Sequence, residues 1–139
     1  MTEDIALLVR QAEAAANSGQ WTVAETLWRD VKRRDPRNSK AAFSLGIHAL
    51  QRREFDEAIK LIEEAHQASP RDPFILLTLS RAKREGGDEA GEGVAIEKAL
   101  AIDPYYLPAL LAKAQRLERT GNAQAAAMFY RNAAKVAGP

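Results

Sequence analysis

The stretch GGDEAGEG at residues 86–93 has the composition of a ligand-binding loop, because it combines four glycines with three carboxylates. Backbone N–H groups of a glycine-rich loop can cradle phosphates, and spaced carboxylates can hold a cation. A dinucleotide fingerprint needs a preceding strand, a P-loop needs Gly-Lys-Ser/Thr, and a calcium loop needs fixed acidic spacing; the stretch meets none of these requirements. We interpret it as a turn in which Gly86 and Gly87 end one helix and Asp88 caps the next.

Two histidines are the other residues that could carry chemistry. His48 and His66 are 18 residues apart and form neither a His-x-Glu/Asp nor a His-Glu-x-x-His pattern. The neighbours Glu63 and Glu64 diverge around a helix, which is typical of a solvated face. No serine has a base near it in the sequence. We therefore predict no catalytic residue, no cofactor and no metal site, and a protein that is not an enzyme.

The charge balance argues against a nucleic-acid partner. The 139 residues carry 20 Lys and Arg against 19 Asp and Glu, whereas nucleic-acid binders usually show a basic excess. The basic run KRRDPRNSK (32–40) has no interleaved aromatics and is interpreted as the cationic end of a helix followed by a turn. Cysteine is absent, and the N-terminus resembles neither a signal peptide nor a membrane span. These features predict a cytoplasmic protein that binds neither nucleic acid nor membrane.

A 34-residue repeat organises the chain. Pro36, Pro70 and Pro104 are 34 residues apart, and four further positions recur in the same register. The fifteenth favours a left-handed helix end, the twentieth is mostly small, and the twenty-fourth and twenty-seventh form an apolar helical face. In chain order they hold Gly19, Arg53, Gly87 and Gly121; Ala24, Ala58, Glu92 and Ala126; Trp28, Ile62, Ile96 and Tyr130; and Val31, Ala65, Ala99 and Ala133. The pattern predicts four pairs of packed helices.

The second unit, SKAAFSLGIHALQRREFDEAIKLIEEAHQASP, resembles the tetratricopeptide repeat (TPR), a helix-turn-helix of 34 residues. The residues that match the signature of the family are Leu45, Gly46, Phe55, Ala58, Ala65 and Pro70. The resemblance covers about the entire chain. It implies an all-α fold, a right-handed α-solenoid of four TPR units at about 5–38, 39–72, 73–106 and 107–139, within a single domain that spans 1–139.

Local signals predict where individual helices begin. Thr22 to Glu25 has the form of a capping box that opens the second helix of the first unit. Asp72 before Pro73 predicts an N-cap followed by proline in the first turn, and Asn122 and Asp56 are placed to cap their helices.

Two further expectations concern burial. Trp21 and Trp28 are seven residues apart and are expected in the core. Glu92 holds the small-residue position of the third unit between Gly91 and Gly93. We expect Glu92 to turn outward while a glycine provides the close approach of the helices, and this helix to fray most easily, because glycine weakens helices.

The resemblance also implies where a partner binds. First helices of TPR arrays line a concave groove, mainly through positions 2, 5, 9, 12 and 13 of each unit. Here these positions combine an apolar floor with cations, and the predicted groove consists of Lys40, Phe43, Ile47, Leu50, Phe74, Leu77, Arg81, Arg84, Leu111 and Gln115. An exposed apolar patch usually marks a binding surface. We expect a non-catalytic protein-interaction module whose partner is a peptide or helix with apolar anchors and acidic flanks.

An alternative is an accessory module of a larger enzyme. The fourth unit, DPYYLPALLAKAQRLERTGNAQAAAMFYRNA, is similar to TPR segments preceding the catalytic domain of bacterial aspartyl/asparaginyl β-hydroxylase-type proteins. This similarity implies a bacterial N-terminal module that positions substrate or mediates self-association, although the iron-binding His-x-Asp…His elements are absent from the sequence. The last helix, AQAAAMFYRNAAKVAGP, is not a polar capping helix, so we expect a second copy or further chain to cover it.

Overall fold

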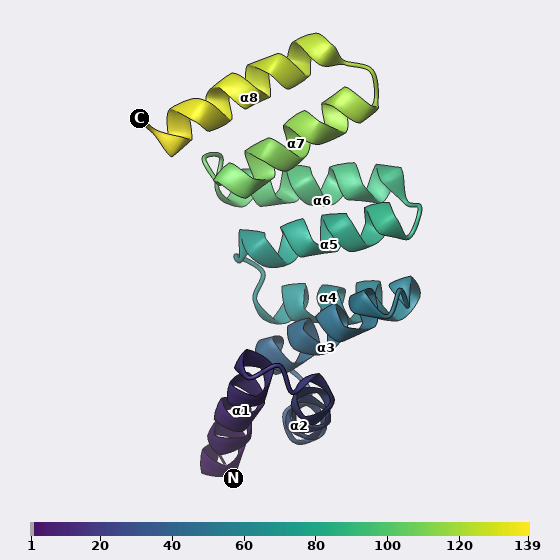
Figure 1. Ribbon diagram of the computed structural model, residues 1–139, viewed down its shortest axis with the longest axis vertical. Coiled ribbons are helices and arrows are strands. Elements are labelled where there is room, and N and C mark those ends of the chain that lie inside the picture. The colour runs from purple at the N-terminus through teal and green to yellow at the C-terminus, as the bar shows by residue number, and fades with distance from the viewer. Residues whose placement is uncertain (1) are drawn as a thin grey trace. The chain divides into compact units, whose positions relative to one another are not determined.

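Eight helices form the regular structure of residues 2–139, the part of the chain that this computed structural model describes. They are α1 (Thr2–Asn17), α2 (Trp21–Arg34), α3 (Ser39–Gln51), α4 (Phe55–Ala68), α5 (Pro73–Glu85), α6 (Glu89–Ile102), α7 (Leu107–Arg119) and α8 (Ala123–Ala137), labelled in Figure 1. Residues 2–139 contain no strand. The all-α prediction is therefore confirmed.

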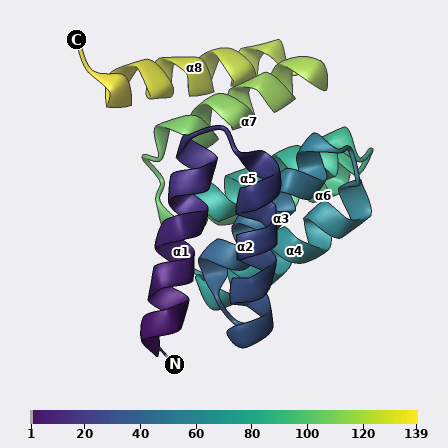
Figure 2. The ribbon, with the colours of Figure 1, turned by 60° about the horizontal axis from the view of Figure 1, so that its bottom comes forward.

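The helices pack as antiparallel hairpins within two compact units. Unit 1 is Met1–Pro70 and holds the hairpins α1–α2 and α3–α4, joined by packing of α2 on α3. Figure 2 shows α1 and α2 side by side. Unit 2 is Arg71–Pro139 and holds α5–α6 and α7–α8, with α7 packed on both α5 and α6. The first helices α3, α5 and α7 begin at the first positions of their 34-residue repeats.

The turn inside each hairpin adopts a left-handed conformation at the fifteenth repeat position. The φ angles are +75° at Gly19, +61° at Arg53, +93° at Gly87 and +86° at Gly121. The predicted conformation is thus present in all four repeats, including the one where arginine replaces glycine. The Arg53 guanidinium lies 5.0 Å from the centre of the Phe55 ring, a cation–π contact that partly offsets the unfavourable backbone angle.

Side-chain caps begin four of the helices. Asp72 accepts a hydrogen bond from the Phe74 N–H, and Asn38, Asp88 and Asn122 each cap the helix that follows them. The cap predicted at Asp56 is wrong, because α4 begins at Phe55 and Asp56 lies inside its first turn. The capping box predicted at Thr22 is also wrong. The N–H of Gln20 donates to the carbonyl of Ala15, which closes the turn early, so α2 begins at Trp21 and Thr22 lies inside the helix.

Small residues at the twentieth and twenty-seventh positions let the paired helices approach. Ala24 and Ala58 have no exposed surface, and Ile62 is equally buried against the first helix of its hairpin. Gly46 on α3 is required by this approach, because a Cβ there would lie 2.7 Å from Cγ1 of Ile62. The repeat pattern thus fixes which face of each helix is internal and leaves the opposite faces for partners.

Candidate partner-binding surfaces

In unit 2, one face of α5 presents apolar and cationic side chains together. Phe74, Leu77, Arg81 and Arg84 follow i, i+3, i+7, i+10 spacing, which places them on one side of the helix. Phe74 is 51% exposed, Leu77 is partly exposed, and both arginines are exposed. Arg81 is held by an ion pair of 2.7 Å with Glu85 one turn later. This face offers hydrophobic contact beside positive charge.

The neighbouring helix α7 contributes Leu111 and Gln115 from positions one turn apart. Leu111 is partly exposed and Gln115 is exposed. Since α5 and α7 pack against each other, their residues can contact one partner within unit 2. We call the set Phe74, Leu77, Arg81, Arg84, Leu111 and Gln115 the first-helix surface of unit 2.

In unit 1, the predicted residues Lys40, Phe43 and Ile47 lie on one face of α3. Lys40 and Phe43 line a hollow of about 520 Å³ between α1 and α3. Lys40 Nζ is 3.3 Å from the carboxylate of Glu13 on α1. Ile47 is partly exposed. Lys40, Phe43 and Ile47 form the first-helix surface of unit 1.

The α1 side of this hollow was not among the predicted groove residues. Glu13, Ala16 and Asn17 line it, and they hold positions 9, 12 and 13 of the first repeat. The same register that selects Phe43 in the second repeat could therefore have found them.

Two expectations about burial are wrong. Leu50 was expected in the groove but is only 4% exposed, because position 12 of this repeat turns toward the interior near the end of α3. Trp21 was expected in the core but is 53% exposed, because it is the first residue of α2. Its ring is arranged edge-on to that of His48, with 6.3 Å between the ring centres. Trp28 is buried, as predicted.

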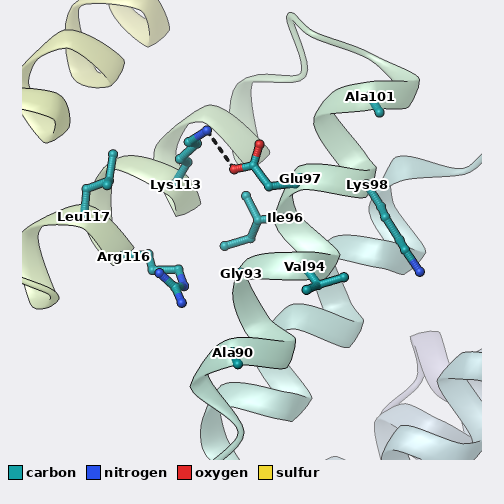
Figure 3. Close-up of a pocket in the computed structure, with 10 residues that line it drawn as sticks. All are labelled: Ala90, Gly93, Val94, Ile96, Glu97, Lys98, Ala101, Lys113, Arg116 and Leu117. Atoms are coloured by element: carbon teal, nitrogen blue, oxygen red, sulfur yellow. Dashed lines mark ion pairs between the residues drawn. The ribbon is translucent and has the colours of Figure 1, made fainter.

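Glu92 is also placed differently from the expectation. It is 3% exposed and points into the α6–α7 interface, where its Oε2 lies 2.5 Å from Nη2 of Arg119 and its Oε1 lies 3.8 Å from Nε of Arg116. Gly93 makes room for this arrangement, since a Cβ there would lie 3.0 Å from the Arg116 guanidinium (Figure 3). The carboxylate is retained inside because two cations from the next helix meet it.

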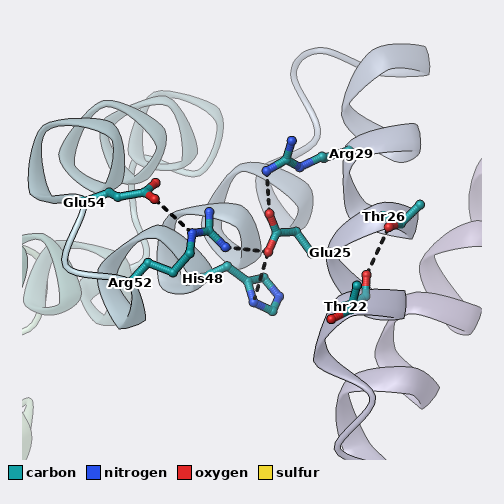
Figure 4. Close-up of polar contacts among 7 residues, drawn as sticks. All are labelled: Thr22, Glu25, Thr26, Arg29, His48, Arg52 and Glu54. Atoms are coloured by element: carbon teal, nitrogen blue, oxygen red, sulfur yellow. Dashed lines mark hydrogen bonds and ion pairs between the residues drawn. The ribbon is translucent and has the colours of Figure 1, made fainter.

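A corresponding polar cluster joins α2 to α3 in unit 1 (Figure 4). Arg52 Nη1 lies 2.6 Å from the Glu25 carboxylate, which also accepts from Arg29. Burial raises the pKa of Glu25, but the hydrogen bonds and charges of Arg52 and Arg29 outweigh it and hold the pKa below its ordinary value of 4.5. The cluster ties two consecutive hairpins together through charge-assisted hydrogen bonds.

His48 lies beside this cluster and is 8% exposed. Burial lowers the pKa of its imidazole below 6.5, and the charges of Arg52 and Arg29 act in the same direction, whereas Glu25 at 3.9 Å opposes them. The surroundings thus favour the neutral form of the ring.

The described residues offer few other kinds of site. No three or more His, Cys, Asp or Glu residues within 2–139 gather closely enough to hold a metal ion. None of the helices in that range is both long and apolar enough to span a bilayer.

The fold and its exposed first-helix faces define an all-α helical-repeat protein, a class that serves as a scaffold for protein interactions. The sequence model described as "Tetratricopeptide repeat" matches residues 9–73. The helices beyond that range continue the same 34-residue unit, with α5 and α7 beginning one repeat apart. Residues 9–73 therefore match the tetratricopeptide repeat family, and the whole described chain has the all-α fold of such a repeat array.

Solved structures share this fold. The crystal structure of MamA superposes with a TM-score of 0.85 at 17% sequence identity, covering 95% of this chain and 77% of that one. MamA 41-end from Desulfovibrio magneticus RS-1 superposes with a TM-score of 0.82 at 21% identity, covering 93% and 73%. At such identities the likeness establishes the fold alone.

A relative by sequence is much longer than this chain. Cellulose synthase 2 operon protein C of Komagataeibacter xylinus is 31% identical over 124 residues. The alignment covers 88% of this chain and 10% of that protein, so the chain spans about a tenth of the relative's length.

Proposed function

We propose that this chain is a protein-interaction module that binds a peptide with apolar anchors and acidic flanks along its first helices. The face of α5 carries the proposal, because Phe74 is half exposed on the same stripe as the exposed cations Arg81 and Arg84. Apolar surface beside positive charge favours a ligand that pairs hydrophobic side chains with carboxylates.

The energetics fit a reversible contact. Each buried apolar anchor of the partner contributes roughly 1.5–3 kcal/mol before the cost of ordering the peptide. Two or three anchors supply about 3–9 kcal/mol in total, so after that cost is subtracted the dissociation constant is expected in the micromolar to millimolar range. The exposed cations contribute mainly to association rate and to selection against basic peptides.

Fluorescence anisotropy with a labelled peptide tests this proposal. The probe alternates leucine or phenylalanine with aspartate and contains prolines that keep it extended. We expect binding to weaken about tenfold in Arg84→Glu and in Phe74→Ala, a loss of about 1.4 kcal/mol each. The matched control is Lys60→Glu, the same charge reversal on the exposed side of α4, which should leave the affinity within about twofold.

Equal binding by Arg84→Glu and the unaltered protein would refute the proposal. So would equal binding of a peptide whose aspartates are replaced by lysines. Far-ultraviolet circular dichroism of each variant verifies that the helices remain folded.

A second candidate function is an accessory region of a longer protein. It is supported by the relative of which this chain spans about a tenth. The proposed role is to position a substrate or to mediate self-association, and an aspartyl/asparaginyl β-hydroxylase-type enzyme is one such context. Reading the native gene beyond codon 139 tests it: we expect an open frame that continues into a further domain, whereas a stop codon there would contradict it.

A further inference from the structure

At three positions the outward side of α6 is apolar where the equivalent helices are polar, and the exposed residues Glu97 and Lys98 lie on the same side. Ala90, Val94 and Ala101 follow i, i+4, i+11 spacing on one side of α6, and Val94 is 54% exposed. The residues 34 and 68 positions earlier in the chain are Asp56, Lys60 and Gln67 on α4, and Thr22, Thr26 and Arg33 on α2. An apolar helix side that replaces a polar one in the same repeat indicates a covered surface.

This side of α6 borders a hollow of about 660 Å³ between α6 and α7 in unit 2. Figure 3 shows Ile96 directed toward α7, Val94 on the outer side of α6, and Leu117 across the hollow. The Arg116 guanidinium packs over Gly93, where a Cβ would lie 3.0 Å from it, so the hollow is open beside Val94 and not above Gly93. The site therefore combines one large exposed apolar side chain with small neighbours.

The rim of the hollow is positively charged. Three cations line it, namely Lys98, Lys113 and Arg116, against the single carboxylate of Glu97. Glu97 is already paired with Lys113 at 2.7 Å. Lys98 is exposed and forms no ion pair within residues 2–139. Because Lys113 is paired with Glu97 and Arg116 lies beside Glu92, Lys98 is the rim cation available to an acidic occupant.

The hollow and the first-helix surface of unit 2 use opposite sides of α7. Successive helical residues are separated by about 100° around the axis. Lys113, Arg116 and Leu117 therefore point about 170° away from Leu111 and Gln115. Two ligands could occupy unit 2 together without competing for α7.

We propose that the α6–α7 hollow is a second docking site, which binds an amphipathic helix of a protein partner whose apolar row is flanked by acidic residues. Ala90 to Ala101 spans about 17 Å along α6, which matches about three turns of a partner helix and its anchors at i, i+4, i+7 and i+11. Alanine and glycine permit the axes to approach closely, and Val94 supplies the central ridge. Occupation of both sites makes the chain a bivalent scaffold.

The test uses a labelled helical peptide of about 16 residues with leucines at i, i+4, i+7 and i+11 and glutamates beside them. Anisotropy measures its affinity for the unaltered protein, for Val94→Lys, and for Ala101→Gln. Both substitutions introduce the residues that α4 carries at the same register, Lys60 and Gln67, so the hairpin should fold normally. We expect at least about a tenfold loss for Val94→Lys and a smaller loss for Ala101→Gln. Lys60→Glu, on the exposed side of α4 and outside both proposed sites, serves as the control and should change the affinity by less than about twofold.

Undiminished binding by Val94→Lys would overturn the proposal, as would equal binding of a probe with lysines in place of the glutamates. Analytical ultracentrifugation of the protein alone measures whether it associates with itself. Concentration-dependent self-association that Val94→Lys abolishes would assign the hollow to a second copy of the chain and would also overturn the proposal. Because the two sites are tested by substitutions on different helices, this proposal can fail while the first-helix proposal stands, and the reverse.

Discussion

Replacing Glu92 by glutamine should destabilise unit 2 although the side chain keeps its size. The carboxylate is 4% exposed and lies 2.5 Å from Arg119, with Arg116 3.8 Å away. Breaking a fully buried pair costs about 3–5 kcal/mol, because the remaining charge stays buried. Here Arg116 and Arg119 keep 26% and 37% of their side-chain surface exposed, so water can solvate them. We therefore expect a smaller loss, about 2 kcal/mol in the free energy of unfolding.

Urea unfolding followed by circular dichroism measures this loss, and amide hydrogen exchange locates it. The expected drop in melting temperature is roughly 8 °C, with faster exchange in α6 and α7 than in α3 and α4. Glu97→Gln is the matched control, because Glu97 pairs with Lys113 across the same two helices but is 58% exposed, and its loss should stay below about 0.5 kcal/mol. Equal effects of the two substitutions would refute the reasoning that burial decides the strength of the pair.

Three further predictions concern the turns, a cap and pH. Gly87→Ala should lower the free energy of unfolding by about 1 kcal/mol, because φ is +93°, and the loss is only backbone strain since the new Cβ meets no atom within 4 Å. Arg53→Gly at the equivalent turn should raise it by up to about 1 kcal/mol. Urea unfolding measures both, and a stabilised Gly87→Ala would contradict the reasoning. Asp88→Ala should cost about 1 kcal/mol because the Gly91 N–H loses its acceptor at 2.8 Å, while Asp88→Asn should be nearly neutral in the same assay. Because the pKa of His48 is lowered in the folded state, His48 does not change the free energy of unfolding above pH 6.5 and lowers it as the pH drops from there toward the folded-state pKa. Urea unfolding at about pH 7.5 and about pH 5.5 should show this loss of stability. The loss should be smaller in His48→Gln.

The 34-residue period made most of the fold predictable from the sequence. Recurrent prolines and alanines set the helix pairs, because each hairpin must bury the same small residues to pack. The left-handed turn at Arg53 shows how far the register extends, since the backbone keeps the repeat conformation even where the favourable glycine is missing. The starts of α5 and α8 were predictable because Asp72 and Asn122 each accept a hydrogen bond from the first turn of the helix that follows.

Residues whose environment depends on another helix were harder to predict. Glu92 is buried because Arg119, 27 residues later, meets it across the α6–α7 interface. The residue pattern of α6 alone does not reveal that partner. The two arginines of α7, Arg116 and Arg119, could have indicated it. Leu50 illustrates a second limit, since a small rotation of α3 decides whether a position near the helix end faces the groove or the core.

Nuclear magnetic resonance mapping of the extended acidic peptide tests the central claim most directly. The proposal that the first helices bind the partner predicts, within unit 2, shifts of the amides around Phe74 and Arg84 on α5 and Leu111 on α7, which saturate with the same dissociation constant as the anisotropy signal. Small shifts confined to the outward sides of α2, α4 or α6, or no shifts at millimolar peptide, would contradict it.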